Sequence, residues 1–219
     1  GNIGSNRYDI RKIPIENRRC DYYFILNNCS KVFFEKYCGI KSNYLLAGSQ
    51  EANFHKKLTH TEKITNQITI VSTYRKKNRY ESEDYNNFFI KPTQFIRNVI
   101  NKLIISKDFK LNILLISDDK SEKKFFTKIF QPLKLNFIEN EIRNNFRKSY
   151  FKLNPNSVYI GDSKLLTECL SLGYKTMFFS LRGYYTNDET YSFGWPINKS
   201  LYGDFWINNP NKKKGIEIL

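Results

Sequence analysis

The strongest constraint on the fold is a regular alternation of strand-like and helix-like segments between residues 67 and 181. Short β-prone apolar runs alternate with segments whose apolar residues recur at helical spacing. Such alternation is typical of a parallel sheet whose strands are joined by crossover helices. The expected strands are 67–73, 111–117, 133–139, 157–160 and 176–181, and the expected helices are 92–106, 121–130, 142–150 and 164–172. The sequence therefore predicts an α/β fold, a Rossmann-like parallel sheet with helices on both faces.

The residues before this alternation predict a second, smaller unit. Two strand-like runs, Asp21–Asn27 and Asn43–Ser49, flank a short helix expected at 30–38. The stretch that follows is polar, carries few apolar side chains and is typical of a linker. We therefore expect a small N-terminal α/β remnant with its linker at residues 1–60 and the Rossmann-like domain at residues 61–219.

Polar residues stand where several of the expected strands end. Arg75 follows the first strand, and Ser117 closes the second. Gly161 and Asp162 follow the strand expected at 157–160. Right-handed crossovers bring the carboxyl ends of parallel strands to one edge, where open α/β sheets bind their ligands. The sequence therefore predicts a ligand site built from these polar strand ends.

The turn Gly161–Ser163 leads directly into the helix expected at 164–172. Backbone N–H groups and the helix dipole at such a start favour an anion, and the Ser163 hydroxyl could add a donor. The alternative is that Asp162 or Ser163 only caps the helix. At the start of another expected helix, residues 121–130, we expect Ser121 to play the same capping role.

Three further side chains are candidates for ligand contact. Glu168 could accept hydrogen bonds from a ribose diol, or it could form a surface pair with Lys164, four residues earlier. Arg182 follows the last clear strand, and its guanidinium matches phosphate or carboxylate, as that of Arg75 does. An isolated loop arginine is otherwise solvated, so both alternatives remain open.

The only two tryptophans, Trp195 and Trp206, lie in loop-like aromatic signatures near the end of the chain. Trp195 belongs to FGWP (Phe193–Pro196), and Trp206 closes GDFW (Gly203–Trp206). Large aromatic side chains in loops bounded by glycine and proline either fill the core or stack on a sugar or base.

The formal net charge of +15 suggests nucleic acid, phosphorylated substrates or an anionic membrane surface as a partner. Residues 151–219 hold 8 basic and 6 acidic residues, so the region richest in motifs is close to neutral. Lys, Asn, Ile, Phe and Tyr are abundant, as an AT-rich genome imposes. We interpret the excess mainly as solvated surface charge, rank a peripheral membrane surface next, and expect no specific nucleic acid.

Cysteine and histidine spacing gives no support for a metal site. The four cysteines form no C-x-x-C pair, and free thiols are the expectation for a reducing cytosol. His55 and His60 share one polar stretch without a cysteine or a clear carboxylate set beside them. We therefore expect no metal and no other cofactor.

The run GDSKLLTECLSLGYKTMFFSLR, followed by FGWP and GDFW, resembles motifs of bacterial surface-carbohydrate biosynthesis proteins. These are glycosyltransferases of the GT-B fold and include Kdo transferases of lipopolysaccharide and capsule assembly. Residues 31–53 resemble the end of that family's N-terminal domain, and residues 68–77 resemble the first strand of its C-terminal domain. The resemblance covers residues 30–206 and is specific in the last fifty of them.

The resemblance implies roles for individual residues. Ser163 and the turn N–H groups would contact the donor phosphate, and Glu168 would bind the nucleotide ribose. Arg182 and Trp195 also fall on motif positions. The family places its catalytic base on the N-terminal domain, so no catalytic residue is assigned. The sequence differs from the family motif at Lys164, at Leu166–Thr167 and at Asp204, so the resemblance does not identify the particular donor.

The expected function is therefore sugar transfer in surface polysaccharide or lipopolysaccharide assembly. The partners would be a nucleotide-sugar donor and a glycan or glycolipid acceptor. The start of the chain has no apolar segment of the signal-peptide kind, and no apolar run is long enough to span a membrane. We therefore expect a cytoplasmic location or one at the inner face of the cell membrane. The alternatives are a non-catalytic nucleotide-sugar or glycan-binding module and a basic nucleic-acid-binding protein.

Overall fold

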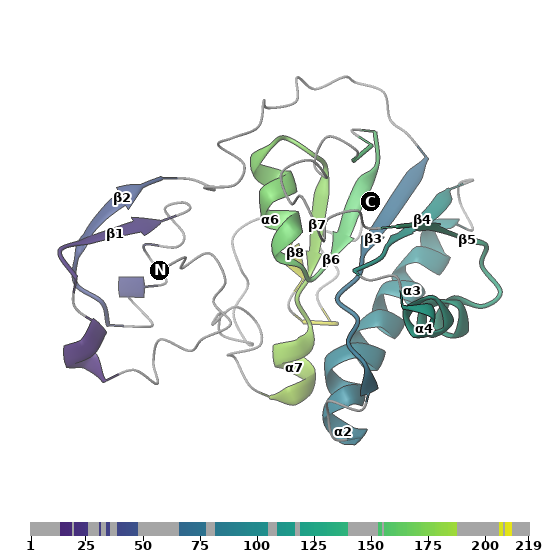
Figure 1. Cartoon of the computed structure of the whole chain (residues 1–219), viewed down its shortest axis with the longest axis horizontal. Helices are drawn as coiled ribbons and strands as arrows, with labels where there is room; N and C mark the ends of the chain where they lie inside the picture. Colours follow the sequence, from purple (N-terminus) through teal and green to yellow (C-terminus); the bar gives the residue numbers. More distant parts are fainter. Residues whose placement is uncertain are drawn as a thin grey trace.

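The computed structural model of the chain describes residues 14–18, 20–25, 31, 34–35, 39–47, 66–77, 82–104, 109–116, 119–139, 153–154, 156–187, 206–207 and 209–211. These residues form two separate parallel sheets, one of two strands and one of six (Figure 1). The predicted linker up to residue 65, the predicted basic helix at 142–150 and the expected domain boundary at residue 60 lie outside the described residues.

The larger sheet has the strand order β5-β4-β3-β6-β7-β8, and every neighbouring pair is parallel. Its strands are β3 (Gln67–Val71), β4 (Lys110–Leu114), β5 (Leu135–Ile138), β6 (Val158–Gly161), β7 (Thr176–Phe179) and β8 (Trp206–Ile207). Counted along the chain this is the order 3-2-1-4-5-6, which is that of dinucleotide-binding Rossmann folds. The predicted α/β class and Rossmann-like sheet are therefore confirmed.

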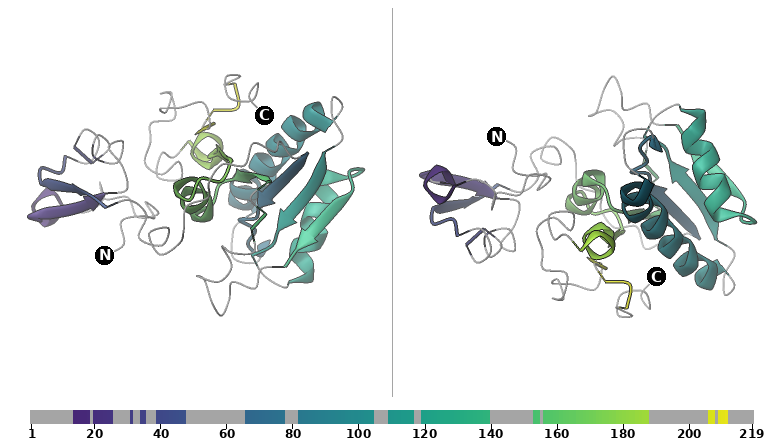
Figure 2. Two further views of the ribbon diagram at one scale, coloured as in Figure 1. Left: turned by 90° about the horizontal axis from the view of Figure 1, so that it is seen from above. Right: turned by 90° about the horizontal axis from the view of Figure 1, so that it is seen from below.

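Helices cover both faces of this sheet (Figures 1 and 2). On one face, α3 (Lys91–Ile104) and α4 (Lys120–Phe130) pack against alternate strand residues such as Ile113 and Ile160. On the other face, α6 (Lys164–Ser171) packs against Tyr159 and the other alternate residues. The central strands are buried on both faces, which explains why they read as continuous apolar runs.

The starts of α4 and α6 show how local sequence sets helix boundaries. Asp119, not Ser121, caps α4, because the Asp119 carboxylate accepts a hydrogen bond from the Ser121 N–H at 2.9 Å. The predicted Ser121 cap is therefore wrong: Ser121 already lies inside the first turn, where its N–H needs an acceptor. Ser163 does cap α6, and Gly173 follows the helix end with φ +93°, as predicted.

A continuous helix precedes the predicted start of α3 at Pro92. It runs through α2 (Ser82–Tyr85) and the π-helical segment η5 (Asn86–Ile90) into α3. The Lys91 N–H bonds to the carbonyl of Asn86, five residues earlier, which defines the wider turn. An α-helical proline ring clashes with the carbonyl four residues before it, and the wider turn directly before Pro92 relieves this.

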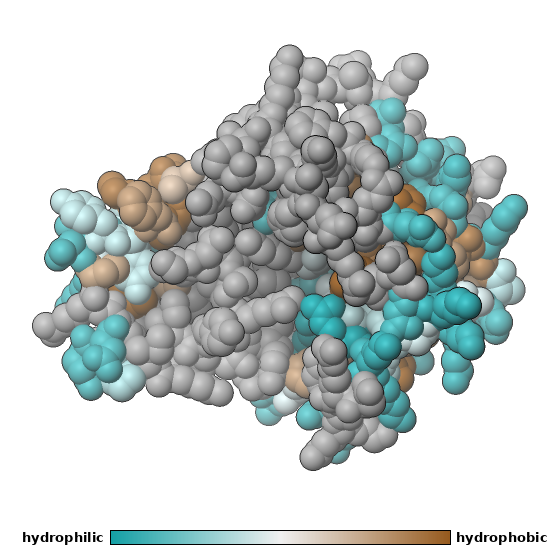
Figure 3. Space-filling model, viewed as in Figure 1, coloured by the Kyte–Doolittle hydropathy of each residue, from teal (hydrophilic) through white to brown (hydrophobic). Residues whose placement is uncertain are grey.

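The smaller sheet pairs β1 (Tyr22–Ile25) with β2 (Asn43–Leu46), which confirms both predicted N-terminal strands. On its inner side the Tyr23 ring packs 5.7 Å from Phe34, which is buried. Large side chains on the outer side and at the end of β2 remain 42–66% exposed, and part of an apolar patch is visible there in Figure 3. These side chains are Tyr22, Phe24, Leu45 and Leu46. Of the helix expected at 30–38, Lys31, Phe34 and Glu35 are described, and they are helical.

Candidate functional site

The strand order reverses between β3 and β6, and these two strands end side by side with Val71 opposite Gly161. Gly161 has φ +144°, and a Cβ there would lie 2.8 Å from the Val71 carbonyl oxygen. Glycine is therefore required at this position by the close approach of the two strands. The crevice at such a reversal is where Rossmann-like sheets hold their ligands.

The turn after β6 leads into α6 with Ser163 as the helix cap. The Ser163 hydroxyl oxygen accepts a hydrogen bond from the Leu165 N–H at 3.3 Å, and its carbonyl accepts one from the Leu166 N–H at 3.0 Å. The capping interpretation of this turn is confirmed. A contact between the same helix start and an anion stays a prediction.

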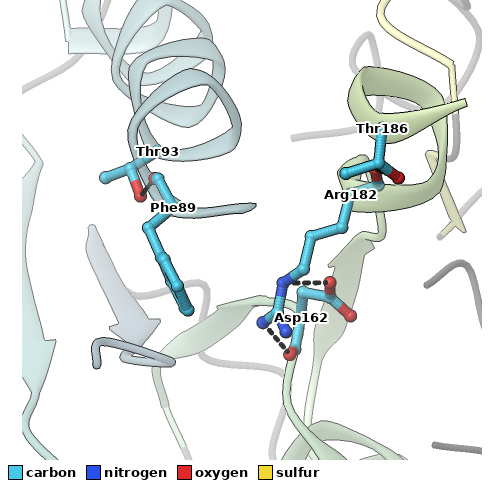
Figure 4. A network of polar contacts seen from close by, with 5 residues as sticks. All are labelled: Phe89, Thr93, Asp162, Arg182 and Thr186. Atoms are coloured by element: carbon cyan, nitrogen blue, oxygen red, sulfur yellow. Dashed lines mark hydrogen bonds and ion pairs between the residues drawn. The ribbon is translucent and has the colours of Figure 1, made fainter. Parts of the chain in front are cut away.

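Two predicted site residues, Asp162 and Arg182, are paired with each other (Figure 4). The Arg182 Nε lies 3.2 Å from Asp162 Oδ2, and its Nη2 lies 3.3 Å from the Asp162 carbonyl oxygen. The side chains are only 18% and 8% exposed. The guanidinium carbon also lies 5.6 Å from the centre of the Phe89 ring. Side chains that follow β6 and β7 thus lie next to each other and next to a ring of the π-helical segment η5.

Sequence reasoning missed Phe89 in this arrangement. The residue lies between the charged stretch of residues 74–87 and the helix start expected at residue 92, and no element was predicted there. The signal that could have found it is the pair Phe88–Phe89 shortly before Pro92, since both phenyl rings are buried. A π turn also breaks the 3.6-residue periodicity on which helix prediction depends.

The loop after β3 is tied to the start of α4. Arg75 is half-buried, and its Nη1 donates to the carbonyl of the preceding Tyr74 at 2.8 Å. Lys76 Nζ lies 2.8 Å from Asp119 Oδ2. The hydrogen bonds from Lys76 and then from Ser121 lower the pKa of Asp119 to about 2. The loop after β3 therefore carries two basic side chains, Arg75 and Lys76, and both already have polar contacts within the protein.

Ser117 lies outside the described residues, but the segment just before it is anchored. The Ile116 N–H donates to Glu122 Oε1 at 3.0 Å, and the Glu122 side chain is fully buried. Sequence reasoning missed Glu122 because it reads as one more charged residue on an amphipathic surface helix. Its role is to hold the end of β4 against α4.

Glu168 lies in α6 and is 1% exposed. Glu168 shares the buried side of the helix with Cys169 and Leu165, so it does not lie at the surface, and its pairing with Lys164 stays a prediction. Burial, and next the neighbouring Glu168 charge, raise the pKa of the Cys169 thiol. The ribose contact of Glu168 stays a prediction.

The sequence model of one protein family, described as "putative O-antigen biosynthesis protein", matches residues 7–219. The chain belongs to this O-antigen biosynthesis family. No curated protein and no solved structure matches the chain. The match spans both sheets, so both belong to the sequence that defines the family. The assignment to lipopolysaccharide assembly, expected from the sequence, is confirmed at the level of O-antigen biosynthesis.

The aromatic signatures of this O-antigen biosynthesis protein are described only in part. Trp195 and the rest of FGWP lie outside the described residues. Trp206, the last residue of GDFW, opens β8 and pairs in register with Phe178 of β7. The next residue, Ile207, is fully buried. GDFW therefore ends in an edge strand of the large sheet, where sequence analysis expected a loop.

The described part of this O-antigen biosynthesis protein contains neither a candidate metal cluster nor a helix that could span a membrane. No group of three or more His, Cys, Asp or Glu residues there could hold a metal ion, and His55 and His60 lie outside it. None of the helices described there has the length and apolar character needed to cross a membrane. Cys20 and Cys169, the cysteines described, are free thiols, the first exposed and the second buried.

Proposed function

We propose that this O-antigen biosynthesis protein binds a nucleotide-sugar at the edge where β3 and β6 end, and transfers the sugar as a GT-B glycosyltransferase does. The observation that carries the proposal is the reversal of strand order between β3 and β6, with the Gly161–Ser163 turn and the start of α6 beside it. Assembly of an O-antigen consists of joining sugars, and each joining step needs an activated donor. The acceptor in this proposal is a glycan or a glycolipid.

The chemistry available at this edge suits a phosphate-linked leaving group. N–H groups at the start of α6 point out of the helix and carry the positive end of its dipole. Arg182 adds a guanidinium from the end of β7. Negative charge grows on the nucleotide phosphate as the sugar leaves, and fixed donors placed there stabilise that charge. Glu168, further along α6, is the residue we propose for the ribose.

Calorimetric titration of the folded chain with CMP, UDP and GDP tests the donor site. We expect one of the three to bind with a single-site isotherm, since the site is built for one nucleotide. Circular dichroism of the same sample establishes that the protein is folded. If none of the nucleotides binds to the folded chain, the donor-site proposal is wrong.

A pair of substitutions at Ser163 locates the phosphate. Ser163→Asp keeps a good helix cap but puts a carboxylate where the phosphate would lie, so nucleotide affinity should fall by about ten-fold or more. Ser163→Asn keeps the cap without adding charge and is the matched control. Both variants should melt close to the wild type. Equal affinities for the two variants would place the phosphate elsewhere.

A second candidate is a donor-binding module that does not transfer sugar. It is favoured by the small size of the described N-terminal sheet, which has two strands, whereas a GT-B enzyme closes its active site with a second Rossmann-like domain. Incubation of the chain with a labelled nucleotide-sugar separates the candidates. Release or transfer of the sugar excludes the module, and nucleotide binding without either supports it.

A further inference from the structure

The guanidinium of Arg182 is held on two of its sides. Its Nε edge faces Asp162, with Nε 3.2 Å from Oδ2 and Nη2 3.3 Å from the main-chain carbonyl oxygen. Its carbon atom Cζ lies over the Phe89 ring, 5.6 Å from the ring centre (Figure 4). A planar cation held by a hydrogen-bonded edge and by an aromatic face keeps a single orientation.

The remaining edge of the guanidinium keeps its donors. A guanidinium has five N–H groups in a fixed fork, and Asp162 occupies one edge of it, through an ion pair at Nε and a hydrogen bond from Nη2. Within the part of the chain that the structure describes, Nη1 of Arg182 has no hydrogen-bond partner. The Nη1–Nη2 edge can therefore present two parallel N–H groups, which is the arrangement that binds a phosphate bidentately.

Two threonines tie down the backbone that carries this arrangement. The Thr93 hydroxyl donates to the carbonyl of Phe89 at 2.5 Å, and the Thr186 hydroxyl donates to the carbonyl of Arg182 at 2.8 Å. Phe89 is 5% exposed, and the π turn that contains it contacts α7 (Arg182–Thr186). The side chains thus converge from three elements whose ends are fixed independently.

We propose that Arg182 binds a phosphate through its Nη1–Nη2 edge and that Asp162 and Phe89 are positioning residues that orient it. Taking this phosphate as that of a nucleotide-sugar rests on the proposed function. A carboxylate next to a phosphate repels it, so Asp162 acts through Arg182 and not as a ligand contact, which differs from the role predicted for it from sequence. Because Asp162 and Phe89 already hold the Arg182 side chain in place, phosphate binding does not have to pay the entropy of ordering it.

Titration with inorganic phosphate, followed by the side-chain NMR signal of the Arg182 Nε–H, tests the proposal. In the wild type this signal should be resolved, because the ion pair of Nε with the Asp162 carboxylate and the burial of both side chains slow its exchange with water, and phosphate should shift it. Asp162→Asn and Phe89→Leu should each weaken phosphate binding about five-fold, because the Arg182 guanidinium loses one of the groups that orient it. Neither substitution removes a positive charge. Arg182→Lys should weaken it to a similar extent while keeping the charge, because lysine lacks the fork.

Arg97→Lys is the matched control, since Arg97 contacts the carbonyl of Gln131 at 3.0 Å, at the far end of α4. This variant should bind phosphate as the wild type does. Tighter phosphate binding by Asp162→Asn would show that Asp162 competes with the ligand, and the proposal would be wrong. Unchanged binding in both positioning variants, or a wild-type Arg182 signal that phosphate does not move, would overturn it as well. If a variant does not fold, the wild-type signal still tests whether phosphate binds at Arg182, and the variant that does fold tests the positioning role.

Nucleotide titrations of the same samples separate this proposal from the proposed function. Nucleotide binding that is insensitive to Asp162→Asn and Phe89→Leu overturns the positioning roles and leaves the donor site intact. Phosphate binding at Arg182 without any nucleotide binding supports the positioning roles and contradicts the donor site.

Discussion

Gly161 and Val71 approach so closely that no side chain fits between them: a Cβ at position 161 would lie 2.8 Å from the Val71 carbonyl oxygen. The two residues are register partners at the ends of β6 and β3, where the strand order reverses. The same glycine has φ +144°, a conformation that other residues avoid. At the sheet edge proposed for the donor, the backbones of β3 and β6 therefore lie in direct contact, and this contact requires glycine at position 161.

Gly161→Ala should therefore destabilise the fold by about 3 kcal/mol, because the new methyl group clashes with rigid strand backbone and the backbone angle is strained. Urea unfolding of the variant measures this loss. Gly39→Ala is the control, since Gly39 has φ +64° but open space around it, and should cost about 1 kcal/mol. Equal losses at the two positions would mean that the contact with Val71 adds nothing.

The large sheet could be predicted because its central strands are buried on both faces and so appear as uninterrupted apolar runs. Ile113 on one face and Leu114 on the other are both buried, and each strand ends at polar residues. The start of the helix before Pro92 could not be predicted in the same way. Tyr85 and Phe89 are buried on a helix whose π turn changes the repeat, and two of the three residues between them are asparagines.

The candidate site could be predicted only as a set of strand ends. Parallel strands necessarily bring Asp162 and Arg182 to the same edge, and the structure has them there. Their ion pair could not be predicted, because a solvated arginine after a strand has the same local sequence. Direct contact depends on β6 and β7 being neighbours and on the direction of each side chain, and both are properties of the tertiary structure.

Glu122 offers a second prediction. Its buried carboxylate accepts the Ile116 N–H at 3.0 Å, so Glu122→Ala leaves that donor without its acceptor and should lower the free energy of unfolding by about 2 kcal/mol. Glu122→Gln keeps an oxygen of the same reach and should lose about half as much. Chemical denaturation of the two variants gives the comparison. If glutamine were no better than alanine, the hydrogen bond to Ile116 would not be what the side chain provides.

A buried hydroxyl pair joins β3 to the residue before β6. The Thr69 and Ser157 side-chain oxygens lie 2.6 Å apart, and both residues are at most 1% exposed. Thr69→Val and Ser157→Ala should each destabilise by about 1 kcal/mol, because each leaves the other hydroxyl with one partner fewer. The double variant should lose less than the sum, by about 1 kcal/mol, since no orphaned hydroxyl remains. Strictly additive losses in urea unfolding would argue against a direct interaction.

Tyr85 predicts how stability changes in alkali. Burial raises its pKa from the ordinary 10.0 to about 12, with a smaller contribution from Tyr74. The folded state therefore holds the phenol proton more tightly than the unfolded chain does. The corresponding stability is complete below pH 10 and is lost as the pH rises from 10 towards 12. Burial also raises the pKa values of Tyr159, Tyr174 and Tyr185, which add to the same decline.

Tyr85→Phe isolates the contribution of this residue. The variant should show a shallower fall of the urea midpoint than the wild type between pH 10 and 12, because phenylalanine releases no proton on unfolding. Tyrosinate absorbance of the folded protein should rise over the same range with a smaller amplitude in the variant. Midpoints of the two proteins that fall in parallel would show that Tyr85 ionises equally readily in the folded and unfolded chains.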